Sequence, residues 1–294
     1  MVTSMLFVPA SDQRKLDKAT RLGPQPLILD LEDAVAISMK PAARQNAADM
    51  IATRGAEVPI FVRVNNVDSG FFFSDLEAII RPGLSGVYVP KVRTSREVLI
   101  ADWLVSSLEQ RAAVPPSTID LAACIETVSG VAHLREICHA SSRLKWLSFG
   151  EGDFCLDVGL EWPPASGQLP ETVIYAKVLV VQESRLAGLE PPHDGAYARF
   201  EDQEGLRKVA VQSKTLGFFG KHAIHPDQLS TIDDVFTPTA VELEQARRIV
   251  DSFSAEEAGG RANIAIDGHF VDYPVYFQAQ RLLALASSGG ADVV

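Results

Sequence analysis

Cysteine is scarce in this sequence. Only three of its 294 residues are cysteines, Cys124, Cys138 and Cys155, and no two of them form a CxxC pair. An odd number of widely spaced cysteines leaves no complete disulfide framework and no thiol cluster with the spacing of a zinc site. We therefore expect a protein of a reducing, cytoplasmic compartment.

Long apolar runs are also missing. No segment holds eighteen consecutive apolar residues, so we expect no transmembrane helix, and the apolar part of the opening MVTSMLFVPASDQRK is too short for a signal-peptide core. A basic excess is missing too: 27 Lys and Arg stand against 38 Asp and Glu, a formal net charge of −11. A chain this acidic repels nucleic acid and anionic membranes, and we expect neither as a partner.

Short apolar, β-branched segments are abundant, and eight of them recur at intervals of about thirty residues. Helical periodicity fills several intervals, as in 95–111 and 171–188. Strands that alternate with helices form parallel sheets, and eight such units predict a (β/α)8 TIM barrel over residues 1–230. A doubly wound sheet is the alternative, but it has no reason to stop at eight units. The predicted strands are 5–10, 27–32, 60–65, 86–91, 121–127, 146–152, 185–192 and 218–226.

Residues 231–294 differ in character from the eight units. The segment TPTAVELEQARRIVDSFSAEE, 237–257, predicts a helix with Thr237 or Thr239 as its N-cap. A Gly-rich link, a short extended piece and a final helix follow. We interpret this region as a C-terminal helical extension rather than a ninth barrel unit.

Polar side chains gather where the predicted strands end. In a parallel barrel the active site is built at the carboxyl ends of the strands, so these residues are candidates for one site. Singly, each has a structural explanation, such as a helix cap or a neutralising ion pair. Together they indicate chemistry. The set is Asp30, Glu32, Asp33, Arg63, Asn65, Lys91, Glu126, Thr127, Glu151, Asp153, Glu190, Asp194, Lys221, His222 and His225.

Carboxylates that converge in a half-buried mouth repel one another unless a cation lies among them. Glu126 and Asp153, from neighbouring strands, are best placed to bind a divalent metal directly, with Glu32 and Asp33 holding its waters. Mg²⁺ is the expected ion because it prefers carboxylate and water oxygens. Zinc is disfavoured because no histidine pair has zinc spacing. Asp30 is the carboxylate least expected to contact the metal's waters.

Arg63 is the candidate for binding a substrate carboxylate, because a planar guanidinium can donate two parallel hydrogen bonds. Metal and arginine together would hold a small 2-oxo or hydroxy acid by its oxygens. Such a site favours formation or cleavage of a carbon–carbon bond through an enolate, since the metal stabilises negative charge on oxygen.

Several stretches resemble a known family, and they occur in order along nearly the whole chain: LFVPAS, LILDLEDAV followed by KPAAR, VRVN, VPKV, CIET, SFGEGDF, HAIHP and IDGHFVDYP. They are similar to the citrate lyase β-subunit-like (CitE-like) acyl-CoA lyases of the HpcH/HpaI aldolase superfamily. The resemblance implies a TIM barrel, Mg²⁺ and a coenzyme A thioester such as malyl-, citramalyl- or citryl-CoA. It implies reversible Claisen-type cleavage to an acyl-CoA and an oxo acid.

The resemblance also implies roles for the residues of these stretches. Glu126 and Asp153 are similar to the metal ligands, with Glu126 also next to the substrate. Glu32 and Asp33 resemble the residues around the metal's waters. Arg63 is similar to the carboxylate clamp, and Lys91 would offset carboxylate charge.

The Asp of HFVDYP, Asp272, resembles the family's acid/base residue, which the C-terminal segment delivers into a neighbouring subunit's barrel. The resemblance thereby implies a homo-oligomer, a trimer or a multiple of one. Asp267 lies five residues earlier and is the alternative, but Asp272 matches the motif before the proline.

The chain departs from the family pattern at two places. Thr3 and Ser4 stand where relatives commonly have an arginine before the first strand, which removes an expected contact to CoA or substrate. Glu151 stands where many relatives have a small residue. For the CoA phosphates, the candidates are Arg14, Lys15 and Lys18.

Three further readings of the same residues stay open. A synthase or thioesterase would use water against a thioester at the metal. An aldolase would act on free oxo acids without CoA. A carrier-protein-dependent lyase subunit would act on an acyl group bound to a partner protein.

Overall fold

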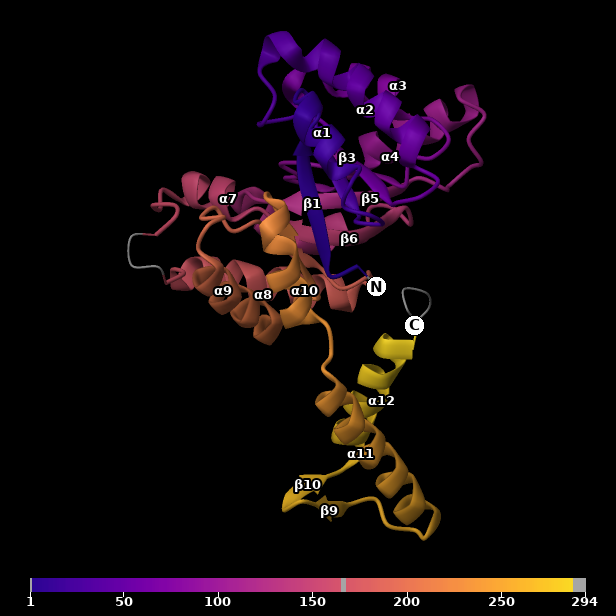
Figure 1. Ribbon diagram of the computed structural model, residues 1–294, viewed down its shortest axis with the longest axis vertical. Helices are drawn as coiled ribbons and strands as arrows, with labels where there is room; N and C mark the ends of the chain where they lie inside the picture. Colours follow the sequence, from indigo (N-terminus) through magenta and orange to yellow (C-terminus); the bar gives the residue numbers. More distant parts are fainter. Residues whose placement is uncertain (1, 165–167, 288–294) are drawn as a thin grey trace. The chain divides into compact units, whose positions relative to one another are not determined.

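A computed structural model describes residues 2–164 and 168–287 of the chain. The chain divides into two units (Figure 1). The first runs from Ser4 to Asp234, and the second contains residues 2–3 and the chain from Val235 onward.

Eight parallel strands close into a barrel in the first unit, and each strand pairs with the next until β8 pairs with β1. The predicted TIM barrel is therefore confirmed. The strands are β1 (Ser4–Pro9), β2 (Leu27–Asp30), β3 (Ile60–Arg63), β4 (Gly86–Val89), β5 (Asp120–Ile125), β6 (Leu144–Phe149), β7 (His193–Asp194) and β8 (Gly220–Ala223).

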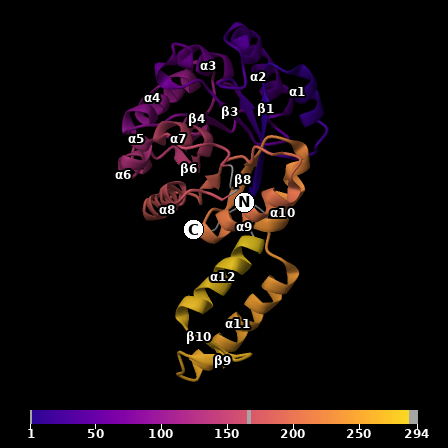
Figure 2. The same cartoon turned by 90° about the vertical axis from the view of Figure 1, so that its left-hand side faces the viewer.

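Helices follow the strands and lie outside them (Figures 1 and 2). Because helices cover the outer face, β2 and β4 are buried over their whole length, as continuous apolar strands should be. The helices are α1 (Gln13–Ala19), α2 (Lys40–Arg54), α3 (Phe72–Ile79), α4 (Ser95–Arg111), α5 (Val128–Ala132), α6 (Leu134–Cys138), α7 (Glu151–Val158), α8 (Glu171–Leu186), α9 (Gln203–Leu216) and α10 (Leu229–Phe236).

The prediction of a seventh strand at 185–192 is wrong. Helix α8 continues to Leu186, and Gly188 turns the chain with a φ of 72°. The true strand, β7, has only two residues, His193 and Asp194, which pair with β6 and β8. Two polar residues carry no apolar pattern, so the end of the preceding helix looked more like a strand than the strand itself.

The second unit is built from two helices and a hairpin. Helix α11 (Ala240–Ala258) begins at a capping box of Thr239 and Glu242, so Thr239 rather than Thr237 is the N-cap. Its Phe253 ring contacts the ring of Tyr276 in α12 (Tyr273–Ser287). Strands β9 (Ile264–Ile266) and β10 (His269–Val271) are antiparallel.

Asp267 occupies the turn between β9 and β10. Its φ is 50° and that of Gly268 is 78°, the left-handed pair that a tight hairpin turn requires. Its carboxylate also pairs with Arg248 at 3.0 Å. The turn and the ion pair together account for an aspartate at this position. In the described part of the chain, no helix combines the length and apolar character needed to cross a membrane.

Candidate active site

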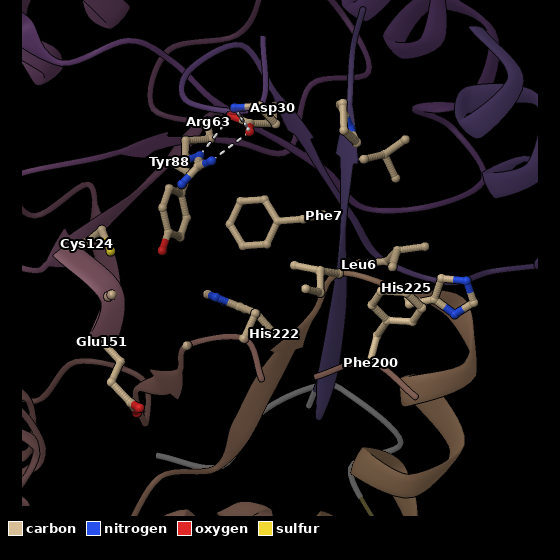
Figure 3. Close-up of a pocket in the computed structure, with 18 of the residues that line it drawn as sticks. Leu6, Phe7, Asp30, Arg63, Tyr88, Cys124, Glu151, Phe200, His222 and His225 are labelled. Carbon is tan, nitrogen blue, oxygen red and sulfur yellow. Dashed lines mark hydrogen bonds and ion pairs between the residues drawn. The ribbon is translucent and has the colours of Figure 1, made fainter. Parts of the chain in front are cut away.

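The carboxyl ends of the barrel strands surround a cavity of about 770 Å³. Asp30, Arg63, Glu126 and Asp153 all line it, and they come from β2, β3, the position after β5 and the first turn of α7. These four sequence-predicted candidates therefore meet in one place, whereas Glu32, Asp33 and Lys91 are not among the lining residues. Figure 3 shows part of this cavity, with Asp30 and Arg63 joined at its wall.

Arg63 is held by Asp30 through two parallel hydrogen bonds. Its Nε donates to Oδ1 at 2.8 Å and its Nη2 donates to Oδ2 at 2.6 Å. Burial alone would raise the pKa of Asp30, but the charge and hydrogen bonds of Arg63 outweigh it and lower the pKa below its usual value. One edge of the guanidinium is thus already occupied, and Nη1 lies 3.5 Å from Oε2 of Glu32. One hydrogen on each of Nη1 and Nη2 is left for other groups.

Lys91 forms ion pairs with the carboxylates of the loop that follows β2. Its Nζ lies 2.9 Å from Glu32 and 2.9 Å from Asp33, and 4.0 Å from Asp153. Its backbone has a φ of 52°, an uncommon conformation for a residue with a side chain. Such strain persists where the surrounding structure fixes it, often at functional sites. The ion pairs of Lys91 with these carboxylates are consistent with the charge-offsetting role that the family resemblance implies.

Glu126 lies at the end of β5 and is only 3% exposed. One oxygen, Oε1, accepts a hydrogen bond of 2.7 Å from the backbone N–H of Lys91. Burial raises the pKa of Glu126 to about 8, and the charges of Glu32 and Asp153 add to the rise. A Cβ at Gly150 would lie 2.2 Å from Oε2, so glycine at that position leaves room for the carboxylate.

The donor set fits a hard divalent cation. Five carboxylates stand close together against three cationic side chains, Arg63, Lys91 and Lys40, and the buried Oε2 of Glu32 has no hydrogen-bond donor within the described residues. A region so short of positive charge and rich in oxygen donors suits Mg²⁺. No group of three or more His, Cys, Asp or Glu side chains in the described ranges is already arranged as a metal cluster. Waters and substrate oxygens would have to complete the coordination.

Sequence reasoning missed how the second-strand loop is fixed. The Nζ of Lys40, in α2, donates to the backbone oxygens of Leu31 and Glu32 at 2.8 and 3.1 Å, and to Oδ1 of Asn65 at 2.6 Å. Lys40 is the first residue of the KPAAR stretch, and this motif carries no local signal for a contact with β3. The Lys40 ammonium ties the loop that presents Glu32 and Asp33 to the neighbouring strand.

Sequence reasoning also missed that a cluster of buried ion pairs lies beside the cavity. Asp194 of β7 accepts from Lys221 at 2.6 Å, pairs with Lys177 at 3.0 Å and accepts from Ser213 at 2.6 Å. Lys177 also pairs with Glu151 at 2.8 Å. Glu151 therefore points to a buried lysine, and the extra acidic charge at this position is neutralised within the protein.

The remaining candidates lie in different places. Lys15 and Lys18 of α1 line the cavity, whereas Arg14 is not among the lining residues. His225 lies at the rim, stacked on Phe200 with ring centres 5.1 Å apart. Asp272 belongs to the second unit, between β10 and α12, where its backbone oxygen accepts a hydrogen bond from the N–H of Tyr276.

Comparison with known proteins places this architecture in a family. The model of the HpcH/HpaI aldolase/citrate lyase family matches residues 3–226. The citrate lyase subunit beta of Haemophilus influenzae is 32% identical over 97% of this chain and 97% of its own length. The L-malyl-CoA/beta-methylmalyl-CoA lyase of Rhodobacter capsulatus is 31% identical over 96% of this chain and 93% of its own.

A solved structure agrees. The CitE protein of Mycobacterium tuberculosis, in complex with magnesium, acetoacetate and coenzyme A, aligns with a TM-score of 0.80 and 26% identity over 97% of this chain and 98% of its own. The barrel, the collinear motifs and the near full-length similarity lead to one assignment. This chain belongs to the HpcH/HpaI aldolase/citrate lyase family.

Proposed function

We propose that this protein is a Mg²⁺-dependent acyl-CoA lyase that cleaves a 3-hydroxyacyl-CoA to an acyl-CoA and an oxo acid, or catalyses the reverse condensation. The observation that carries the proposal is the meeting of Glu126, Asp153 and an Arg63 already oriented by Asp30 in one cavity. The family's named lyases act on or bind such compounds: one relative is a malyl-CoA lyase, and one structural neighbour holds magnesium and coenzyme A.

Glu126 and Asp153 would hold the metal, and Glu32 and Asp33 would accept hydrogen bonds from its waters. When bound, Mg²⁺ supplies positive charge that stabilises negative charge on substrate oxygens. Lys91 forms ion pairs with both Glu32 and Asp33, and its positive charge reduces the repulsion between the two carboxylates. Arg63 would bind the carboxylate of the oxo-acid half with its remaining N–H groups.

The bond changes follow from the substrate's structure. In the cleavage direction the 3-hydroxyl gives its proton to solvent water, its oxygen forms a carbonyl, and the bond to the thioester's α-carbon breaks. The electron pair stays on the acyl-CoA as an enolate, and the α-carbon then takes up a proton. We assign this last proton to Asp272, and in condensation the same carboxylate would remove it.

The CoA part of the substrate needs cationic and apolar contacts outside the metal region. Lys15 and Lys18 line the cavity and are suited to bind phosphates, and the stacked Phe200 and His225 rings lie on its rim. Arg14 lies in the same helix but does not line the cavity, so Lys15 and Lys18 are better placed to bind the CoA phosphates.

The test uses the purified full chain with Mg²⁺ and malyl-, citramalyl- and citryl-CoA, with release of free acyl-CoA and oxo acid as the readout. Glu126→Ala and Asp153→Ala are expected to lose Mg²⁺ binding, measured by calorimetry, together with turnover. Asp49→Ala, an exposed carboxylate on α2, is the control and should change neither. Full turnover by either site variant without added Mg²⁺ would refute the metal assignment.

The same assay separates the alternatives. Activity on a free hydroxy acid alone indicates an aldolase without CoA. Release of free CoA without an oxo acid indicates a thioesterase. Inactivity on every free CoA ester, with activity on an acyl group attached to a carrier protein, indicates a carrier-dependent subunit.

A further inference from the structure

The interior of this barrel is open near the site. In TIM barrels the interior is normally filled by layers of packed side chains. Here Phe7, in the middle of β1, remains partly exposed and lines the cavity together with Tyr88, Cys124 and His222. The cavity therefore continues past Arg63 into the barrel. We call this part, defined by Phe7, Tyr88, Cys124 and His222, the interior chamber (Figure 3).

Aromatic rings form the walls of the interior chamber. The ring centre of Phe7 lies 5.8 Å from that of Tyr88 and 5.3 Å from that of His222, both edge to face. The Tyr88 hydroxyl is hydrogen-bonded to Ser148, so its polar end has a partner within the protein. These walls offer apolar surface and no charge of their own.

His222 is the polar exception in the interior chamber. The residue is 1% exposed, and its buried Nε2 has no hydrogen-bond partner within the part of the chain that the structure describes. A buried polar atom without a partner costs about 1–3 kcal/mol, so it usually marks the place of a water or ligand group. Burial, with the nearby His193, Lys221 and Arg63, holds the pKa of His222 well below its usual value despite the opposing charge of Asp194. The imidazole is therefore uncharged at neutral pH.

The distance from Arg63 to His222 suits a small acid. The guanidinium carbon lies 4.8 Å from the ring centre of Phe7, and this centre lies 5.3 Å from that of His222. The guanidinium carbon of Arg63 and the ring centre of His222 are therefore no more than about 10 Å apart. A 2-oxo acid of three or four carbons whose carboxylate is bound by Arg63 can place its other end at the imidazole.

We propose that the interior chamber receives the substituent of the oxo-acid half of the substrate, and that His222 selects a substituent ending in an uncharged hydrogen-bonding group such as a hydroxyl. The inference rests on the proposed function, because it takes the Arg63-bound carboxylate as its anchor. An alkyl end would leave Nε2 unpaired. A second carboxylate would lose its hydration among rings and a neutral imidazole, with no cation in the interior chamber to replace it.

Two acids of equal size test this selection. Hydroxypyruvate and 2-oxobutyrate each extend pyruvate by one heavy atom, an oxygen in one and a carbon in the other. The wild-type chain should bind hydroxypyruvate more tightly, and His222→Leu should lower the ratio of the two affinities by about 10-fold or more. His222→Gln, which keeps a hydrogen-bonding side chain, should retain part of the preference.

His193→Leu is the matched control. It removes a buried imidazole from the neighbouring strand that stacks on Trp146 at 5.1 Å and lies 5.5 Å from the His222 ring, but is not among the cavity-lining residues. Because it keeps Nε2 of His222, it should change the affinity ratio far less than His222→Leu does. Circular dichroism and the Tm of each variant establish that it is folded.

Binding is measured by calorimetry with Mg²⁺ and without CoA, and condensation with acetyl-CoA is measured separately. A shifted affinity ratio in His222→Leu without turnover of any CoA ester would uphold the interior chamber and reject the proposed lyase. Turnover with an unchanged ratio would reject the interior chamber and leave the lyase standing. Failure of the wild type to bind either acid, or an equal shift in His193→Leu, would also overturn the inference.

Discussion

Asp30 orients Arg63, a role that its position in the second strand did not reveal. Its carboxylate accepts two hydrogen bonds from Arg63 and two more from the backbone N–H groups of Glu32 and Ala34, at 2.9 and 3.2 Å. One buried side chain thus fixes both the arginine and the loop that carries Glu32. Asp30 is a positioning residue, since the guanidinium is aligned before any substrate arrives.

Replacing Asp30 by asparagine tests this positioning. Asp30→Asn removes the charge and one acceptor while keeping the size, so the plane of Arg63 is no longer fixed. We expect kcat/KM to fall by about 10²-fold, mainly through a higher KM for the oxo acid. The KM for acyl-CoA should stay the same, and the affinity for Mg²⁺ should fall less than the affinity for the oxo acid, because Asp30 also holds the loop that carries Glu32.

Arg63→Lys provides the comparison, because a lysine cannot donate the paired hydrogen bonds that Asp30 accepts. If Asp30 acts through Arg63, then Asp30→Asn should add little to the effect of Arg63→Lys in the double variant. Fully additive losses would show that Asp30 acts independently of Arg63 and contradict the assignment.

At the scale of secondary-structure elements, β7 is the shortest strand of the barrel, and the contacts of Asp194 compensate for its few backbone hydrogen bonds. The side chain joins Lys177 of α8, Ser213 of α9 and Lys221 of β8. Burial alone would raise the pKa of Asp194, but the charges of Lys177 and Lys221 outweigh it and lower the pKa well below its usual range. A two-residue strand is thus held through three neighbouring elements.

We expect Asp194→Asn to lower the free energy of unfolding by about 3–5 kcal/mol at pH 7, because the buried Lys221 loses its anion and Lys177 keeps only Glu151. Since the folded-state pKa of Asp194 is depressed, its stabilisation is complete above the unfolded-state pKa and is lost as the pH falls. The difference between wild type and variant should therefore hold from pH 7 to 5 and shrink below about pH 4.

Urea unfolding at each pH measures this difference. Asp234→Asn, which breaks an exposed ion pair of 3.0 Å with Arg207, is the control and should cost about 0–1 kcal/mol. An Asp194→Asn deficit that stays constant down to pH 3 would show that the cluster stabilises the fold by packing and not by charge.

The elements differ in how far the sequence predicted them. Helix α4 was predicted at its observed bounds, because its regular apolar spacing is a local signal. The barrel was predicted because its strands are apolar on both faces. The Asp30–Arg63 pair and the Asp194 cluster were not, because each joins residues far apart in the chain, and a single sequence does not show which charges meet.

At the scale of the whole molecule, contacts within the second unit do not explain the exposed aromatic side chains that it carries. Its hairpin and helices carry Asp272, and they leave Phe270 and Phe277 exposed at 68% and 58%. Exposed apolar side chains mark a binding surface where they gather in one contiguous patch. We propose that this unit supplies Asp272 to the barrel of a second copy in a homo-oligomer, a trimer or a multiple of one.

Two inactive variants test the sharing of sites. Asp272→Asn should slow turnover by about 10²–10⁴-fold while Mg²⁺ binding persists, and Arg63→Ala should lose carboxylate binding. When both are co-expressed with different tags and the mixed oligomer is purified through both, random pairing gives an intact barrel and an intact Asp272 at about a quarter to a third of the sites. We therefore expect activity far above that of either variant alone. If the mixed oligomer is as inactive as its parents, each site takes its acid/base residue from its own chain or from a residue other than Asp272.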